Sequence, residues 1–255
     1  MKLSHYMLTD VGRKRKNNED SILVNSDLGL YLLADGMGGH AAGEVASRLA
    51  IETIESFFKA NTDISELAIN RLMNFPPGLS LPAKKLLWSI MESNTVIIKE
   101  VEKNQDLRGM GTTIVALHPG EDDILLGHVG DSRIYRVRRN RLRRITEDHS
   151  LFERELKKNI HTRSEIDSMP QKDSLTRALG HMPKATVDLN YVTPRAGDIF
   201  ILCSDGLTDM VNEDVILGIV SENTDDINAA GDLLLHTALQ NGGVDNISII
   251  LVKVD

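Results

Sequence analysis

Four aspartates of this chain stand beside glycine or asparagine at the edges of apolar runs. They are Asp20 in Asn17-Asn18-Glu19-Asp20, Asp35 in Ala34-Asp35-Gly36-Met37-Gly38-Gly39-His40, Asp205 in Cys203-Ser204-Asp205-Gly206 and Asp245 in Gly242-Gly243-Val244-Asp245-Asn246. The runs at residues 30–34 and 199–203 are typical of buried strands, so the aspartates beside them fall at strand ends. Side chains from distant segments can converge there, and the pattern therefore predicts a carboxylate metal site.

The chemistry of these residues favours a hard cation. Several carboxylates without Cys or His at metal-ligand spacing suit Mg²⁺ or Mn²⁺ better than Zn²⁺. Two such ions about 3.5 to 4 Å apart can share a bridging carboxylate, lower the pKa of a water and hold phosphoryl oxygens during in-line attack. The glycines after Asp35 and Asp205 let the backbone turn sharply, which brings the Gly36 carbonyl within reach of a cation. An isolated Asp-Gly would be read as a turn, but four matched sites favour a metal centre.

A phosphate-binding base is also required, and Arg15 lies four residues before Glu19. Its planar guanidinium can present a fork to two phosphate oxygens. Considered alone, Arg15 would be interpreted as one surface cation among Arg13, Lys14 and Lys16.

The segments that must position these residues read as an α+β fold. Strands are predicted near residues 22–24, 30–34, 113–117, 124–129, 134–137, 199–203 and 247–252. Helical spacing of apolar residues predicts helices over residues 43–58, over a segment that Pro82 opens and that continues to about Val101, and near residues 230–237. Successive strands with tight connections and a pair of inserted helices favour mainly antiparallel sheets covered by helices.

One insertion interrupts this pattern. Ser150-Leu151-Phe152-Glu153 has the spacing of a capping box, so a short helix should begin there and lead into a polar segment that ends near Gln171. We expect a single domain over residues 1–255, with a flap at about 150–173 beside the site.

Length and composition point to an ordinary globular protein. The chain has 255 residues, of which 41% are hydrophobic and 26% charged. It lacks the apolar region of a signal peptide and any apolar stretch near the roughly 18 residues of a membrane span, so a cytoplasmic location without membrane attachment is expected. The single cysteine, Cys203, lies in an apolar run and is interpreted as a core residue.

The net charge of −8 argues against general nucleic-acid binding, although residues 133–144 contain seven arginines. The alternation there suggests a hairpin that turns near Arg139 and Asn140, with arginines on its solvent face. Because Tyr135 is the one aromatic residue available for stacking, a solvated or substrate-steering face is favoured over a nucleic-acid site.

Taken together, these motifs resemble the metal-dependent protein serine/threonine phosphatases, the PPM or type 2C family, in its compact bacterial form. The match covers nearly the whole chain in order. Besides the motifs above it includes Asp10-Val11-Gly12, Arg15, Gly111-Thr112-Thr113, Gly130-Asp131-Ser132-Arg133, Thr146-Glu147-Asp148-His149-Ser150, Leu175-Thr176-Arg177-Ala178-Leu179-Gly180 and Ser204-Asp205-Gly206-Leu207. Each motif is a modest signal, but their joint order is highly specific.

The resemblance implies two central antiparallel sheets packed as a sandwich and flanked by helices, a four-layer αββα arrangement with metals at one edge. It implies that Asp35 bridges two Mn²⁺ or Mg²⁺ ions. Asp205 and Asp245 would complete the first ion's ligands, and the Gly36 carbonyl with water held by Glu19 would serve the second. Asp20 would orient a metal-bound water, Asp131 with Asp205 would hold a weaker third ion, and Arg15 would bind the substrate phosphate.

The general acid is a departure from the pattern of some members, which have a histidine directly after the Asp-Gly. Here Met37 fills that place, and His40 lies three residues further on. His40 is a candidate acid, but a hydrogen bond within the turn is the favoured interpretation, and metal-bound water could supply the proton instead. His149 adjoins the predicted helix start at Ser150 and is interpreted as structural.

The function implied is hydrolysis of phosphoserine and phosphothreonine on proteins by direct attack of metal-activated water. The implied partners are phosphorylated proteins, including bacterial Ser/Thr kinases and their substrates, and a monomer is the default state. Two alternatives stay open. One is a scaffold that keeps this fold without catalysis. The other is a metal-dependent phosphatase or phosphodiesterase acting on a small molecule or nucleic acid, for which the arginine-rich hairpin is the main argument.

Overall fold

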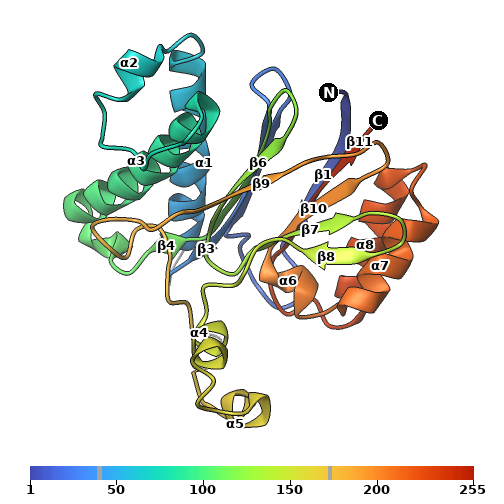
Figure 1. Cartoon of the computed structure of the whole chain (residues 1–255). Helices are drawn as coiled ribbons and strands as arrows, with labels where there is room; N and C mark the ends of the chain where they lie inside the picture. Colours follow the sequence, from blue (N-terminus) through green and yellow to red (C-terminus); the bar gives the residue numbers. More distant parts are fainter. Residues whose placement is uncertain (39–41, 172–173) are drawn as a thin grey trace.

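The computed structural model describes residues 1–38, 42–171 and 174–255. Two antiparallel sheets form its centre (Figure 1). The first sheet has the strand order β2-β3-β5-β6-β9, and β4 pairs with the end of β3. Its strands are β2 (Asp20–Asn25), β3 (Leu30–Met37), β4 (Gly111–Thr112), β5 (Ile114–Pro119), β6 (Ile124–Val129) and β9 (Asp188–Val192).

The second sheet has the order β1-β11-β10-β7-β8. Its strands are β1 (Leu3–Asp10), β7 (Arg133–Val137), β8 (Leu142–Arg144), β10 (Ile199–Cys203) and β11 (Ile247–Val254). The two ends of the chain meet in this sheet, because β1 pairs with β11 from Leu3 opposite Val254 to Asp10 opposite Ile247.

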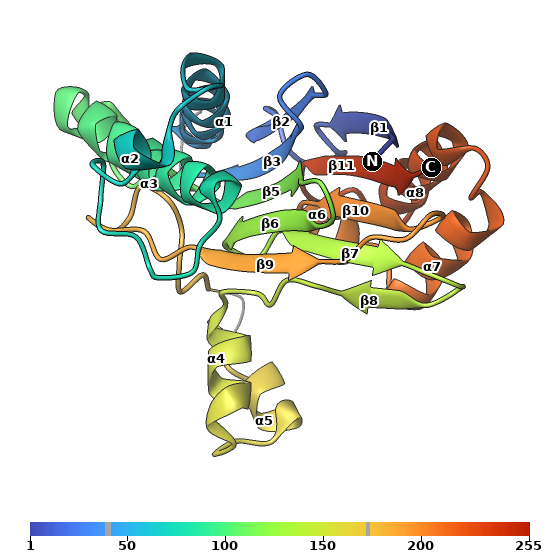
Figure 2. The ribbon, with the colours of Figure 1, turned by 45° about the horizontal axis from the view of Figure 1, so that its top comes forward.

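Helices cover the outer face of each sheet, which gives the four layers expected from the sequence (Figure 2). Helices α1 and α3 lie on the first sheet, and α7 and α8 lie on the second. The helical segments are α1 (Ala42–Ala60), α2 (Glu66–Ile69), α3 (Leu81–Lys103), η1 (Gln105–Leu107), α4 (Leu151–Lys158), α5 (Arg163–Asp167), α6 (Asp205–Thr208), α7 (Glu213–Glu222) and α8 (Ile227–Gln240). No helix within the described residues is long and apolar enough to cross a membrane.

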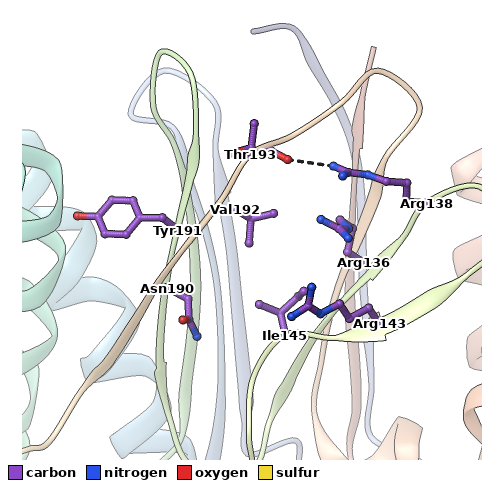
Figure 3. A pocket seen from close by; sticks show the side chains of 8 residues that line it. All are labelled: Arg136, Arg138, Arg143, Ile145, Asn190, Tyr191, Val192 and Thr193. Carbon is purple, nitrogen blue, oxygen red and sulfur yellow. Dashed lines mark hydrogen bonds between the residues drawn. The ribbon is translucent and has the colours of Figure 1, made fainter.

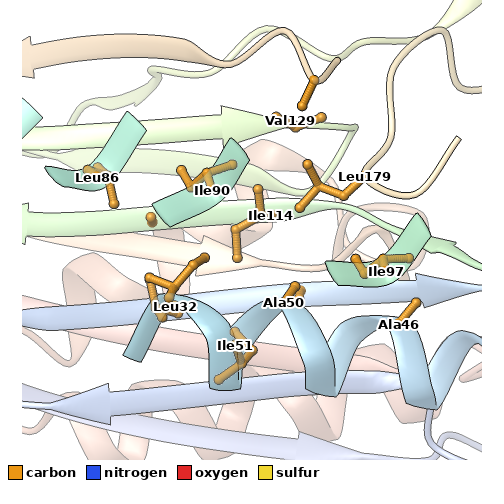
Figure 4. Close-up of a cluster of buried hydrophobic side chains, with 14 of the residues drawn as sticks. Leu32, Ala46, Ala50, Ile51, Leu86, Ile90, Ile97, Ile114, Val129 and Leu179 are labelled. Atoms are coloured by element: carbon orange, nitrogen blue, oxygen red, sulfur yellow. The ribbon is translucent and has the colours of Figure 1, made fainter. Parts of the chain in front are cut away.

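Three hydrophobic clusters hold the layers together. One lies between the first sheet and its helices, and it includes Ala46 and Ala50 of α1 and Leu32 of β3 (Figure 4). A second joins the other sheet to its helices, and a third, which includes Leu33 and Phe200, lies between the two sheets. Burial of these apolar surfaces is the main stabilising contribution, at about 25 cal/mol for each Å² removed from water.

Sequence signals at the helix ends agree with the structure. The Ser80 hydroxyl caps α3 by accepting from the Ala83 N–H, and Pro82 lies in the first turn, where its missing N–H costs no intrahelical bond. Ser150 caps α4 in the same way through the Glu153 N–H. Helices α4 and α5 then project from the body of the molecule (Figures 1 and 2).

The arginine-rich segment folds as the expected hairpin of β7 and β8. Arg139 and Asn140 have φ of 50° and 56°, the left-handed values that a two-residue turn of type I′ requires. The expectation of a solvent-facing arginine row is wrong in part. Arg133 and Arg144 bind Asp148, and Arg138 binds Asp198, all as partly buried ion pairs. Their acidic partners lie outside the hairpin sequence, so its alternation alone could not reveal them.

Candidate metal centre

Five acidic residues from separate segments line one cavity of about 490 Å³ at the edge of the sandwich. The segments are the loop before β2, the end of β3, the turn between β6 and β7, the start of α6 and the loop before β11. Each is a strand end or the loop beside one. The five are Glu19, Asp35, Asp131, Asp205 and Asp245, and the cavity is also lined by Arg15, Gly36, Met37, Gly38, Thr113 and Leu175.

Asp20 does not itself line this cavity but pairs in register with Asp35, which does, across strands β2 and β3. Both Asp20 carboxylate oxygens are buried and neither has a well-formed hydrogen bond. The nearby Ser248 and Ser204 hydroxyls lower the pKa of Asp20, but the effect of burial is larger and raises that pKa to about 6. Buried carboxylate oxygens without partners are rare, and a cation or an ordered water is their usual complement.

Asp35 is held by its main chain. Its N–H donates to Thr113 Oγ1 over 2.9 Å, and its carbonyl accepts from Thr112 Oγ1 over 2.8 Å and from the Thr113 N–H over 2.9 Å. The Thr113 hydroxyl also contacts Ser132 Oγ at 2.7 Å. The main-chain bonds leave the Asp35 carboxylate free to face the cavity. Thr113 and Ser132 thus position the centre through the backbone. Both residues belong to motifs noted in the sequence, but this positioning role was not predicted from them.

The electrostatics of the cavity favour a bound cation. Burial, followed by repulsion from Asp20 and Asp205, raises the pKa of Asp35 well above its usual range. Burial and the nearby Asp131 raise the pKa of Asp205 to about 8, and burial raises that of Asp131 to about 6. Neighbouring carboxylates oppose one another's ionisation, which raises their pKa values, and a bound divalent cation lowers them again.

An arginine already offers positive charge to this site. The Arg15 Nη2 atom lies 2.5 Å from Asp245 Oδ2, so the guanidinium expected to bind phosphate is paired with a predicted metal ligand. The oxygen donors that line the cavity and the unpartnered buried oxygens of Asp20 together fit hard divalent ions. Arg15 would have to leave Asp245 in order to bind a phosphate with its full fork.

Glycine is required where the loop before β2 meets the end of β3. A Cβ on Gly36 would lie 2.2 Å from the Gly43 carbonyl oxygen and 2.4 Å from that of Glu19. The Gly36 N–H donates to the Glu19 carbonyl over 3.2 Å, which ties the two segments together. This close approach brings the Gly36 backbone and the Glu19 carboxylate, whose pKa burial raises, to the same cavity.

Asn246 is a positioning residue that the sequence analysis did not identify. Its Oδ1 accepts from the Glu19 N–H over 2.8 Å, and its Nδ2 donates to the carbonyls of Val11 and Asn17, each over 3.0 Å. The Asn246 N–H donates to Asp245 Oδ1. One buried amide therefore joins the loops that carry Arg15, Glu19 and Asp245, and only its place directly after Asp245 could have hinted at this.

The turn that carries Asp131 is anchored by His149. The His149 N–H donates to the Gly130 carbonyl over 2.8 Å, and the Gly130 N–H donates to His149 Nδ1 over 3.0 Å. The structural interpretation of His149 agrees with these bonds. His149, His128 and Asp188 form a second group of potential ligands. His149 is engaged within the protein at both ring nitrogens, because Nδ1 accepts from the Gly130 N–H and Nε2 lies 3.1 Å from both Asp188 Oδ2 and Arg177 Nη1.

The general acid has no structural assignment. Met37 lines the cavity, while His40 lies outside the residues that the structure describes.

Leu175 reaches the cavity from the segment that follows α5, and Ser150 forms a β-bridge with it. The chain directly after the insertion thus lines the site. The buried Cys203 is a core residue, and burial raises its thiol pKa to about 12.

Comparisons with known proteins agree with this geometry. The family model described as Protein phosphatase 2C matches residues 12–240. The serine/threonine phosphatase stp of Listeria welshimeri is 36% identical over 248 residues, which cover 96% of this chain and 93% of that protein.

Solved structures are also similar. The serine/threonine phosphatase of S. agalactiae has a TM-score of 0.86 and 35% identity, with 100% of both chains covered. The catalytic domain of the serine/threonine protein phosphatase PstP, solved with two manganese ions, has a TM-score of 0.79 and 34% identity over 99% of both chains.

Proposed function

This chain belongs to the protein phosphatase 2C family, and from that premise we propose that it removes phosphate from phosphoserine and phosphothreonine of proteins. The observation that carries the proposal is the convergence of Asp20, Asp35, Asp205 and Asp245 on one site, with both oxygens of Asp20 buried and unpartnered. A scaffold without catalysis would have no need to keep so many mutually repelling carboxylates together.

We infer that the acidic residues serve as ligands for two ions, which is the number of manganese ions in the PstP domain. We assign Asp35, Asp205 and Asp245 to one Mn²⁺ or Mg²⁺ ion. Asp35, the Gly36 carbonyl and Glu19, acting through water, are assigned to the other. Asp131 and Asp205 would hold a weaker third ion. Divalent cations bound here would neutralise charge on the phosphoryl oxygens and lower the pKa of the attacking water.

The remaining residues bind and orient. Asp20, buried beside Asp35, would accept a hydrogen bond from the attacking water and so orient it. Arg15, with its side chain 54% exposed, would exchange its bond to Asp245 for two bonds to phosphate oxygens. Direct attack by water is also favoured because the chain's single thiol is buried with a pKa of about 12 and offers no nucleophile.

The experiment that tests this function is phosphate release from a phosphothreonine peptide with Mn²⁺, with Mg²⁺ and without metal. The expected result is metal-dependent release that Asp35→Asn and Asp205→Asn each reduce at least a hundredfold, about 2.7 kcal/mol or more of transition-state stabilisation. Asp225→Asn, which removes an exposed carboxylate between α7 and α8, is the control and should keep full activity. Absence of release from folded native protein with either metal would overturn the proposal.

Partners and location follow from the same proposal. The substrates are phosphorylated proteins, among them Ser/Thr kinases and the proteins they modify, acted on in the cytoplasm by a monomer. The net charge of −8 disfavours nucleic acid and anionic membranes as partners. Light scattering after size exclusion tests the monomer, and hydrolysis of an oligonucleotide compared with a phosphopeptide tests substrate class.

We also propose that residues 150–173 act as a flap that selects protein substrates within one catalytic domain. Support comes from the projection of α4 and α5 beyond the sheets (Figure 2) and from Leu175, just after the insertion, which lines the cavity. A protein substrate that reaches the metal centre would meet these helices, whereas a small aryl phosphate would not.

A further inference from the structure

A second cavity lies where the two sheets end side by side. Strand β8 is the last strand of one sheet and β9 is the last strand of the other, and a cleft of about 380 Å³ separates them. Figure 3 shows arginines on the β7 and β8 side and Asn190 and Val192 on the β9 side. The lining residues are Arg136, Arg138, Arg143, Ile145, Asn190, Tyr191, Val192 and Thr193.

Arg136 occupies a position where the strand pattern calls for an apolar residue. Side chains of β7 alternate between the helix-covered face and the face toward the other sheet. Ile134 packs into the hydrophobic cluster between the sheets, so Arg136, two residues later, points to that same face. Its neighbour on β10 is Phe200, which belongs to that cluster. Folding alone gives no reason for a guanidinium at this position.

The surroundings of the Arg136 guanidinium make its charge unfavourable for folding. Arg143 lies directly opposite it in the pairing of β7 with β8, and like charges in that position destabilise a sheet. The Arg136 Nε atom is buried and has no hydrogen-bond partner. Burial, together with Arg138 and Arg143, lowers the pKa of Arg136. A bound anion would relieve each of these effects.

The nearest carboxylate is already engaged. Arg138 holds both oxygens of Asp198, and the Arg195 N–H also donates to Asp198 Oδ2. Arg138 is itself fixed by donating to the Thr193 carbonyl over 2.9 Å, which joins the two walls of the cleft. Arg136 and Arg143, by contrast, form no ion pair within the part of the chain that the structure describes. Two guanidinium groups with free donors therefore face one cavity.

We propose that this cleft is a binding site for a phosphoryl dianion. Two planar guanidinium forks match the charge and the tetrahedral oxygens of a phosphate better than those of a single carboxylate. The Asn190 amide on the opposite wall supplies a further donor, and Val192 with Ile145 forms an apolar floor. The phosphoryl group can belong to a second phosphorylated residue of a protein substrate or to phosphate free in solution.

This site is separate from the metal centre. Arg136 lies on β7, whereas Asp131 lies in the turn before that strand, and none of the described residues that line this cleft also lines the metal cavity. A phosphate held by Arg136 is therefore not the phosphate that is hydrolysed.

The test measures binding of inorganic phosphate to metal-free protein by calorimetry and by thermal shift, with ionic strength held constant by chloride. Arg136→Gln and Arg143→Gln are compared with Arg141→Gln, which removes an exposed arginine from the same hairpin outside the cleft. Phosphate affinity should fall at least tenfold in the first two variants and stay unchanged in the third. Equal affinity in all four proteins, or no binding to the native protein, would overturn the proposal.

Two further readouts separate binding from folding and from catalysis. Without phosphate, Arg136→Gln should melt at the native temperature or above, because the opposed charges are gone, whereas a lower melting temperature would indicate a structural role and count against the site. Turnover of a small aryl phosphate with Mn²⁺ should be the same in all variants. A phosphoserine peptide that binds more tightly than inorganic phosphate, and loses that advantage in Arg136→Gln, would identify a phosphoprotein as the source. Equal affinities would identify free phosphate.

Discussion

Burial and the nearby carboxylates raise the pKa of Asp205 to about 8, so ionising it in the metal-free protein costs folding free energy. Asp205→Asn should therefore raise the melting temperature of chelator-treated protein at pH 8.5, where the native side chain is ionised. With saturating Mn²⁺ the order should reverse, because only the native carboxylate gains from the cation. Thermal melts of both proteins with and without Mn²⁺ measure this. A variant less stable than native protein under both conditions would contradict it.

Asn246 is an uncharged residue near the centre whose side chain makes three hydrogen bonds. Asn246→Ala leaves the Glu19 N–H and the carbonyls of Val11 and Asn17 without their partner. Because these bonds are only partly buried, the loss measured by urea unfolding should fall in the lower part of the roughly 1 to 3 kcal/mol that an orphaned buried group costs. Asn223→Ala, which removes an amide that caps α7 far from the site, should leave the Mn²⁺ dependence of activity unchanged. Asn246→Ala should raise the Mn²⁺ concentration needed.

Residue type explains which parts of the site the sequence could predict. Asp35, Asp205 and Asp245 stand out because carboxylates at strand ends have few structural uses, and the structure brings them to one cavity. Thr113 and Asn246 act through bonds to main-chain groups of distant segments, and such bonds leave no spacing pattern in a sequence. The pairing of Arg15 with Asp245 likewise depends on the folded arrangement.

Among the strands, β6 carries the group with the clearest consequence for pH. His128 is buried against His149, and burial with repulsion from that ring lowers its pKa to about 3 from the usual 6.5. Below pH 6.5, His128 therefore binds a proton in the unfolded chain but stays neutral in the folded chain until the pH approaches 3. The stabilising contribution is complete above pH 6.5 and is lost as pH falls toward 3, by at most ~1.4 kcal/mol per pH unit.

The predicted loss of stability on acidification can be measured by urea unfolding between pH 7.5 and 4.5. Native protein should lose more stability on acidification than His128→Gln, while His236→Gln, which changes an exposed ring on α8, should follow the native curve. Asp188 raises the pKa of His128 and Arg177 lowers it, so both stay unchanged in these variants. Parallel curves for all three proteins would contradict the assignment to His128.

Elements with strong periodicity were predictable and weakly patterned ones were not. The buried residues of α1 and α3 recur at helical spacing, and both helices form as expected. No strand was expected at β1 or β9, where β1 has no fully buried residue and β9 has only Val192. Helix α7 was also missed, because its Val-Ile-Leu-Gly-Ile-Val run fits a strand as well as a helix. Strand β1 forms because it pairs with β11, and β9 forms because it pairs with β6. Helix α7 forms because it packs on the second sheet.

At the scale of the whole molecule, the insertion can be removed without separating the segments that flank it. The Leu151 N–H donates to the Ser174 carbonyl over 2.9 Å, so the two ends of the insertion already touch. Replacing residues 152–173 by a short glycine linker should preserve turnover of a small aryl phosphate within about threefold and change relative rates on different phosphoproteins by tenfold or more. Steady-state rates on both substrate types provide the measurement. An equal loss on both would rule out a selective flap.

The pairing of β1 with β11 also determines how the molecule responds to force. The first and last residues are adjacent, since the Asp255 N–H donates to the Lys2 carbonyl and Leu3 lies opposite Val254. Because the strands are antiparallel, a load applied between the two chain ends acts across this ladder, perpendicular to the strands. Its hydrogen bonds would break one pair at a time, as in opening a zipper, and not all together as in shear. Tension between the termini should therefore peel β1 away first and expose the edge of β11 while the acidic cavity is still intact.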